Sequence, residues 1–297
     1  MKKIIAKYQN GNTEVTILND GTKIREYEGI PNIEFPESLD IKITNYCDLG
    51  CSYCHENSTI QGTHAHLDIL LIKLKELPAG IELAIGGGNP LSHPEIYEFL
   101  IKLKELEFIA NITVNQKHIE SYYELITRLI SEDLIKGLGI SIVNNDYTNI
   151  SKLMKLTNNI VFHIIMGIND INVISELKSI SNYCKVLILG YKTFGRGINY
   201  KSDIVLNNIN NWCMHLPKYF NSVTLSFDNL AIEQLDLKRF FTTEGWNKFY
   251  MGDDFTFTMY IDAVKQNYAP TSRSENRVSF NDSTLIDYFK NNKGSKI

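Results

Sequence analysis

The sequence predicts an α/β fold in which a parallel sheet forms one barrel-like domain. From residue 39 onward, short apolar runs alternate with segments whose apolar residues recur at helical spacing, which is the pattern of repeated strand–helix units. Residues 94–106 illustrate the helical segments, because Ile96, Phe99 and Leu103 fall on one stripe. No internal repeat, low-complexity tract or linker divides the chain, so a single domain is the simplest arrangement.

The expected elements follow one another in a regular order. Asn10-Gly11 and Asp20-Gly21 are turn signals on either side of the β-type run 15–17, which predicts a small β-meander. We divide the chain into the meander with its connector (1–36), a core (37–200) and a C-terminal part that completes or caps the barrel (201–297). The strands expected after the connector are residues 39–44, 81–85, 110–114, 138–143, 160–166, 186–189, 223–227 and 255–262.

The composition is that of an ordinary globular protein. Hydrophobic residues make up 43% and charged residues 22% of the 297 residues, and the net charge is −4, which gives no electrostatic reason to expect a nucleic-acid or membrane-surface partner. The N-terminus turns polar too soon for a signal peptide, and no apolar run reaches membrane-spanning length. We therefore expect a cytoplasmic protein. Its five cysteines do not make an even disulfide framework.

Three cysteines, Cys47, Cys51 and Cys54, fall in one loop after the first strand of the expected sheet. Their spacing lets the backbone curl so that three sulfurs point inward, and thiolates select zinc, Cu(I) or iron–sulfur centres. A closed zinc site or an electron-transfer cluster usually has four protein ligands, so three ligands leave one coordination position for something else. The alternatives are a zinc site completed by His55 and a chance cluster of buried thiols.

The pattern Cys-x3-Cys-x2-Cys, with the aromatic Tyr53 before the last cysteine, resembles the signature of the radical S-adenosylmethionine (SAM) superfamily. The resemblance implies a partial (β/α)6 barrel of the TIM type, with the N-terminal β-meander and a C-terminal extension added to it. It also implies that Cys47, Cys51 and Cys54 bind a [4Fe–4S] cluster whose fourth iron is chelated by SAM. An electron from the reduced cluster then cleaves SAM, and the 5′-deoxyadenosyl radical removes a substrate hydrogen.

After the second of these strands comes the sequence Gly86-Gly87-Gly88-Asn89-Pro90, which resembles the Gly-Gly-Glu-Pro motif of the superfamily. In that family the backbone of the motif binds the amino group of SAM, and glycine allows the close approach. Asn89 stands where the family carries glutamate, so the contact at that position differs. A tight turn without a ligand is the alternative reading of the motif.

Further SAM contacts are expected where the next strands end, because the active sites of such barrels lie at the carboxyl ends of the strands. The third strand ends in Thr113-Val114-Asn115-Gln116, where relatives often carry Thr-Asn-Gly. By resemblance, Ser141 contacts the ribose and carboxylate region of SAM and Met166 lies against the adenine. Thr113, Asn115 and Tyr53 are expected as further cofactor contacts. Hydroxyl and amide groups suit these contacts because they add no net charge. Helix capping is the alternative for the polar residues, and core packing explains Met166 equally well.

The later loops are expected to contact the substrate. The sixth strand leads into a glycine-rich loop with Lys192 and Arg196, the seventh ends at Asp228, and the last segment carries Arg273 and Arg277. Because cations outnumber the carboxylate, and guanidinium groups favour paired oxygens, we expect a substrate with a carboxylate or phosphate. The alternatives are solvated loop charges, a helix cap at Asp228, and pairing of the two last arginines with surface acids.

The expected function is that of a radical SAM enzyme with one [4Fe–4S] cluster, acting on a small molecule, a peptide or a nucleotide. An electron donor such as flavodoxin or ferredoxin is expected as a partner. Cys184 and Cys213 are isolated, unlike the cysteine-rich extension that holds auxiliary clusters in many relatives, so we expect ordinary thiols there. The alternative from another class is a noncatalytic protein that keeps an iron–sulfur or zinc centre for structure.

Overall fold

The computed structural model describes residues 2–181 and 183–293. This part of the chain contains a ten-stranded sheet in the order β10-β9-β8-β7-β6-β5-β4-β11-β12-β13. The strands from β10 to β11 in this order are parallel, and β12 and β13 are antiparallel. The strand bounds are β4 Ser38–Thr44, β5 Glu82–Gly87, β6 Ile109–Asn115, β7 Gly137–Ser141, β8 Ile160–Ile165, β9 Lys185–Leu189, β10 Thr224–Phe227, β11 Thr258–Asp262, β12 Asn267–Ala269 and β13 Val278–Ser279.

Each of the eight predicted strands is present in this sheet. The strands β4 to β9 are neighbours in chain order, and β10 extends the row beside β9. The eighth strand, β11, instead pairs with β4 at the other side of the row. The described sheet is therefore open, with β10 and β13 at its edges, and the fold is α/β with a mostly parallel sheet, as predicted.

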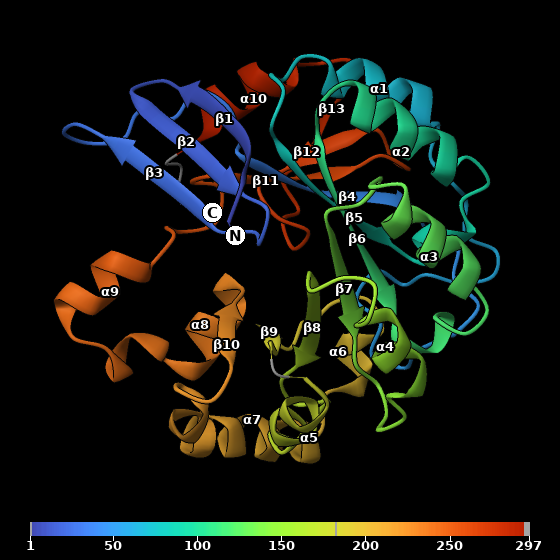
Figure 1. Ribbon diagram of the computed structural model, residues 1–297, viewed down its shortest axis with the longest axis vertical. Helices are drawn as coiled ribbons and strands as arrows, with labels where there is room; N and C mark the ends of the chain where they lie inside the picture. Colours follow the sequence, from blue (N-terminus) through green and yellow to red (C-terminus); the bar gives the residue numbers. More distant parts are fainter. Residues whose placement is uncertain (1, 182, 294–297) are drawn as a thin grey trace.

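The helices lie around the outside of the curved sheet (Figure 1). Along β4 the side chains of Leu39, Ile41 and Ile43 are buried in the main core, whereas Asp40 and Lys42 face the inside of the curve. None of the described helices has the length and apolar character needed to cross a membrane. The helix bounds are α1 Leu67–Leu74, α2 Ile96–Glu105, α3 Tyr123–Ser131, α4 Thr148–Leu153, α5 Val173–Ile180, α6 Gly197–Tyr200, α7 Asp203–His215, α8 Asn229–Leu235, α9 Thr243–Phe249 and α10 Leu285–Asn292.

The predicted meander forms a separate three-stranded antiparallel sheet of β1 (Ile4–Asn10), β2 (Thr13–Leu18) and β3 (Lys23–Tyr27). Its second turn lies against the amino ends of the main strands. There Lys185 Nζ donates to the Asp20 carbonyl at 2.9 Å, and Asn159 Nδ2 donates to the Asn19 carbonyl at 2.8 Å. Apolar residues of β2 also pack against the start of β6. The meander therefore covers the amino end of the main sheet.

Candidate active site

The cysteine loop follows β4 and returns along the end of the same strand. The Cys47 amide donates to the Thr59 carbonyl at 2.9 Å, and the Cys54 amide donates to the Cys51 carbonyl at 3.2 Å, which closes a tight turn between the last two cysteines. The three thiols are partly exposed, whereas Cys184 is buried. Burial raises the pKa of the Cys47 and Cys51 thiols, and neighbouring thiols raise it further. A bound metal would offset this by stabilising the thiolates.

The spacing of the three sulfurs tests which kind of centre the loop fits. Among the described residues, the one set of three possible ligand atoms that lie within 4.8 Å of one another is Cys47, Asp48 and His118. At least one pair of the three cysteine sulfurs is therefore more than 4.8 Å apart, which is wider than the roughly 3.8 Å that tetrahedral zinc with 2.3 Å bonds requires. His118 belongs to the set with Cys47 and Asp48 because its Nε2 lies 2.8 Å from Asp48 Oδ1. The loop fits a multinuclear iron–sulfur cluster better than a single zinc ion.

The loop after β9 packs directly on the cysteine loop. Arg196 Nε donates to the Cys51 carbonyl at 2.8 Å, Arg196 Nη2 donates to the Ser58 carbonyl at 3.0 Å, and the Arg196 amide donates to the Cys54 carbonyl at 3.0 Å. A Cβ on Gly195 would lie 2.3 Å from the His55 carbonyl oxygen, and Gly195 has a positive φ of 57°. Arg196, predicted to hold the substrate, thus binds the backbone of the cysteine loop. Its role towards a substrate stays a prediction.

The glycine motif approaches the cysteine loop from the other side. A Cβ on Gly87 would lie 2.5 Å from the Thr44 carbonyl oxygen, and one on Gly88 would lie 2.1 Å from that of Tyr46. Gly86 is different, because its missing Cβ has no neighbour within 4 Å and the residue lines a cavity. The first glycine therefore leaves space for a ligand, and the next two allow close backbone packing. Asn89 is buried and its Oδ1 accepts from the Leu91 amide at 3.2 Å, capping a 3₁₀ turn that begins at Pro90.

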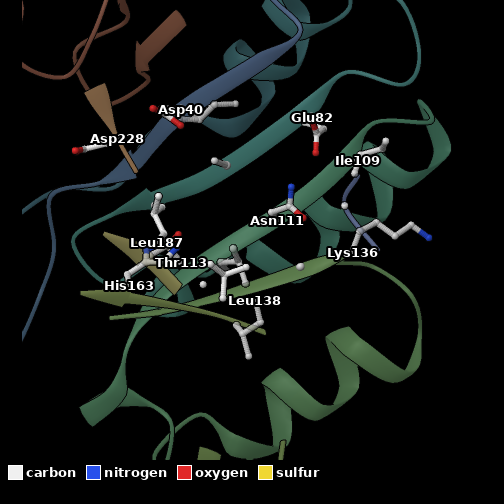
Figure 2. A pocket seen from close by; sticks show the side chains of 18 of the residues that line it. Asp40, Glu82, Ile109, Asn111, Thr113, Lys136, Leu138, His163, Leu187 and Asp228 are labelled. Carbon is white, nitrogen blue, oxygen red and sulfur yellow. The ribbon is translucent and has the colours of Figure 1, made fainter. Parts of the chain in front are cut away.

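A cavity of about 520 Å³ lies on the inner face of the sheet. Figure 2 shows Asp40 of β4, Asn111 and Thr113 of β6 and His163 of β8 around it. These three are alternate strands of the sheet. On β8 and β9 the lining residues alternate along the strand, because every second side chain of a strand points to the same face. Lining residues that carry or can carry charge are Asp20, Asp40, Lys42, His55, Glu56, Glu82, Lys136, His163, Lys185, Lys192 and Asp228.

The mouth of this cavity carries a buried charge network next to the cysteine loop. Lys42 Nζ lies 2.7 Å from Glu56 Oε2 and 3.4 Å from Asp262 Oδ2. Burial opposes ionisation of Glu56, but His55 and Lys42 outweigh it and hold its pKa well below the usual range. Lys192 Nζ lies 3.3 Å from His55 Nε2 and 3.1 Å from Ser272 Oγ. Burial and Lys192 lower the pKa of His55, whose Nε2 also lies 3.4 Å from Glu56 Oε1.

Sequence reasoning missed most of this network. Neither Lys42, Glu56 nor Asp262 is among the predicted site residues. The available signal was the polar face of residues 39–44, where Asp40 and Lys42 alternate with apolar residues. That alternation predicts two unlike faces but does not say whether the polar face meets solvent or an internal cavity.

Two of the five predicted substrate residues line the cavity, namely Lys192 and Asp228. Asp228 also caps α8, since its Oδ1 accepts from the Ala231 amide at 2.7 Å and from the Gly190 amide at 2.9 Å. Arg273 pairs with Asp254 at 2.6 Å and Arg277 lies 3.9 Å from an Asp262 carboxylate oxygen, and neither arginine lines the cavity. Of the five predicted substrate residues, the structure thus brings one cation, Lys192, and one acid, Asp228, to the cavity.

Of the other residues predicted to contact SAM, some line the cavity and some do not. Thr113 lines the cavity. Asn115 caps the 3₁₀ turn Gln116–His118 by accepting from the Lys117 amide at 3.0 Å, and Ser141 is partly exposed at the end of β7. Met166 is fully buried in the main core, which favours the packing role. Tyr53 contacts Tyr200 edge to face, with ring centroids 5.7 Å apart. Their contacts with SAM stay predictions.

Comparison with known proteins adds an independent line of evidence. Residues 41–181 match the model of the radical SAM superfamily, and no curated protein matches the chain. Similar solved structures are Streptococcus suis SuiB bound to precursor peptide SuiA (15% identity, 87% of this chain and 65% of that chain covered, TM-score 0.59), SuiB bound to S-adenosylmethionine (15%, 87% and 66%, 0.61) and native anSMEcpe with bound AdoMet and Cp18Cys peptide (14%, 86% and 80%, 0.53).

At these identities the likeness to solved structures shows a common fold. The chain spans 65% and 66% of the SuiB chain in the two structures, which is slightly less than two thirds. The family match carries more, because it covers the cysteine loop and the glycine motif together. Members of this superfamily use a [4Fe–4S] cluster and SAM, which the spread thiols and the open space at Gly86 fit. Residues 41–181 therefore form a radical SAM superfamily domain, in which Cys47, Cys51 and Cys54 fit the Cys-x3-Cys-x2-Cys motif.

Proposed function

We propose that this chain is an enzyme that holds one [4Fe–4S] cluster at Cys47, Cys51 and Cys54 and cleaves SAM reductively. When bound, the cluster supplies the electron for this cleavage, and the 5′-deoxyadenosyl radical that results removes a hydrogen from the substrate. The observation that carries the proposal is the place of the cysteine loop. The two residues after Cys54, His55 and Glu56, line the polar cavity on the inner face of the sheet, so a cluster here adjoins a space for reactants.

The surrounding residues have separate tasks in this proposal. Arg196 holds the carbonyls of the cysteine loop and so fixes the positions of the thiols. Gly86 leaves room at the cavity for SAM to approach the backbone, while Gly87 and Gly88 keep that backbone tight against the loop.

The proposal extends to the fold of the superfamily. The strands β4 to β9, in unbroken order, correspond to a partial (β/α)6 barrel, to which β10 and β11 add one strand on each side. The meander and the C-terminal elements are additions to that core. The division of the chain into three parts at residues 36 and 200 stays a prediction. The strand β11 belongs to the third part but pairs with β4 of the second, so these two parts share one sheet.

The substrate that we favour is a peptide. The support is that SuiB and anSMEcpe, which share the fold, were solved with bound peptides. The sequence predicted a carboxylate or phosphate on the substrate from four cationic side chains in the later loops. Only one of the four, Lys192, lines the cavity, so the structure supports an anionic substrate group less than the sequence did. An electron donor such as flavodoxin or ferredoxin stays a prediction.

The proposed reaction is tested by reconstituting the protein anaerobically with iron and sulfide, reducing it with dithionite and adding SAM. We expect 5′-deoxyadenosine and methionine to form slowly without any substrate. Cys51→Ala should abolish this product, whereas Cys184→Ala, which removes a buried thiol outside the loop, should keep it. A reconstituted, reduced wild-type protein that leaves SAM intact would contradict the proposal.

A further inference from the structure

Asp40 lies on β4 and faces the cavity. It comes two residues before Lys42, which belongs to the charge network at the mouth of the cavity. In the sheet it is in register with Ala84 on β5 and with Tyr260 on β11, and both also line the cavity. Asp40 is an exposed residue, yet burial raises the pKa of its carboxyl. These two facts agree if the exposed surface meets the cavity while protein encloses the residue on the other sides. Among the described residues, its carboxyl group has no hydrogen bond or ion pair.

The charges around Asp40 are already committed to other groups or repel it. Lys192 is the cation that favours its ionised form, but Lys192 Nζ is directed at His55 and Ser272. Asp228 and Asp254 act in the opposite sense and help to raise the pKa of Asp40. Lys42, two residues further along the strand, is engaged by carboxylates of the network. Within the described part of the chain, the carboxyl group of Asp40 therefore has neither a counter-ion nor a hydrogen bond.

Part of the cavity wall on β6 and β8, two and four strands away from β4, is polar and uncharged. Asn111, Thr113 and His163 line the cavity (Figure 2), and their side chains form no hydrogen bond within the described part of the chain. Burial lowers the pKa of His163 to about 4, so its imidazole is neutral at ordinary pH. Gly139 keeps the space open, because a Cβ there would lie 2.8 Å from His163 Nε2 and 2.9 Å from Thr113 Oγ1. The cavity thus holds free hydrogen-bonding groups together with the unpaired carboxyl group of Asp40.

We infer that Asp40 binds a protonated nitrogen group of the substrate, an ammonium or a guanidinium, inside the cavity. This rests on the proposed function, because it assigns the cavity to the substrate of that reaction. A cation would neutralise the enclosed carboxylate and form charge-assisted hydrogen bonds with it, and Asn111, Thr113 and His163 would accept or donate towards the polar atoms beside it. The site takes a cation where the sequence predicted an anion, because Arg196, Arg273 and Arg277 are bound by the chain itself.

The test uses n-butylammonium chloride as the probe and sodium butyrate as its anionic counterpart. Each is titrated into the reconstituted protein with SAM, and binding is followed by calorimetry. We expect saturable binding of n-butylammonium that Asp40→Asn weakens by roughly 10-fold or more, the loss expected for one charge-assisted hydrogen bond. Glu82→Gln is the matched control, since Glu82 also lines the cavity but is paired with Lys23 at 2.7 Å. This control should bind the probe as the wild type does.

Three results would overturn the inference: no saturable binding of n-butylammonium, equal binding by wild type and Asp40→Asn, or tighter binding of butyrate than of n-butylammonium. Thermal unfolding of Asp40→Asn, with Asp40→Ala as a second variant, shows whether the altered proteins are folded. SAM cleavage without substrate is measured in the same preparations. If the wild type does not cleave SAM, the proposed function fails, while loss of probe binding alone in a variant that cleaves SAM bears only on Asp40.

Discussion

Arg196 connects the two loops on which the cysteine site depends. Its guanidinium reaches two carbonyls of the cysteine loop, and its amide reaches a third. A planar guanidinium can donate in two directions at fixed angles, which an ammonium group cannot do. We expect Arg196→Lys and Arg196→Gln to lower the iron retained after reconstitution to about half or less, because a misplaced ligand typically costs 10–100-fold in metal affinity. Iron and sulfide analysis after desalting measures this.

Arg273→Gln is the matched control for Arg196. Arg273 is also partly buried and also makes a short contact, but its partner is Asp254 and it does not line the cavity. This variant should retain as much iron as the wild type. Equal retention in Arg196→Gln would show that the contacts of Arg196 with the loop do not stabilise the site.

The three glycines at the end of β5, Gly86 to Gly88, differ in role, because the first leaves space for a ligand and the next two allow close packing. Gly86→Ala adds a methyl group where no atom lies within 4 Å, so it should leave the unfolding temperature unchanged and weaken SAM binding by about 10-fold, the cost of an extra methyl in a filled site. Gly87 has a φ of 117° and its Cβ would meet the Thr44 carbonyl oxygen. Gly87→Ala should therefore destabilise the fold by about 1–3 kcal/mol. If Gly86→Ala binds SAM as tightly as the wild type, the motif is only a turn.

At the scale of elements, β4 shows what a sequence can and cannot predict. Its alternation of apolar and polar residues predicted a strand, and the strand is present with Leu39 and Ile41 in the core. The same pattern could not show that Asp40 and Lys42 point into a cavity, because the curvature that encloses the polar face arises from all the strands together. Glu56 was missed for a similar reason, since its partner Lys42 precedes the cysteine loop and meets it only in the fold.

The network at the end of β4 should contribute to stability as a unit. Lys42 and Glu56 are largely buried, so removing one partner leaves the other charge poorly compensated, which costs about 3–5 kcal/mol. Glu56→Gln should lower the free energy of unfolding by about this amount, and adding Lys42→Met should recover part of the loss. Asp68→Asn breaks an exposed pair with Lys102 and should cost far less than loss of the buried pair, because solvent screens it. Equal costs for the buried and exposed pairs would contradict the assignment.

At the scale of the whole molecule, the order of strands was predictable but the edges of the sheet were not. The strands β4 to β9 follow the chain, as repeated strand–helix units require. The position of β11 beside β4 depends on a contact between residues 38 and 258, and nothing local in either segment specifies it. The contact of the meander with Lys185 and Asn159 at the amino end of the sheet is equally nonlocal. These two placements close the space around the cavity from outside the predicted core.

The enclosed cavity should make the stability of the molecule depend on pH through His163. Its pKa is lowered to about 4 by burial, whereas an unfolded histidine titrates near 6.5. Between these values the unfolded chain binds a proton that the folded chain does not, so stability falls as the pH drops from about 6.5 to 4, by at most about 1.4 kcal/mol per pH unit. His163→Gln should reduce this loss, measured by urea unfolding at about pH 7 and pH 5. An unchanged loss would mean that His163 is solvated in the cavity.

The measurement that tests the central claim most directly is the iron and sulfide content of the anaerobically reconstituted protein and of five single cysteine variants. We predict about four iron and four sulfide per chain in the wild type, a marked loss in Cys47→Ala, Cys51→Ala and Cys54→Ala, and wild-type content in Cys184→Ala and Cys213→Ala. A colourless wild-type protein that takes up one zinc ion, or full iron in Cys51→Ala, would contradict the account.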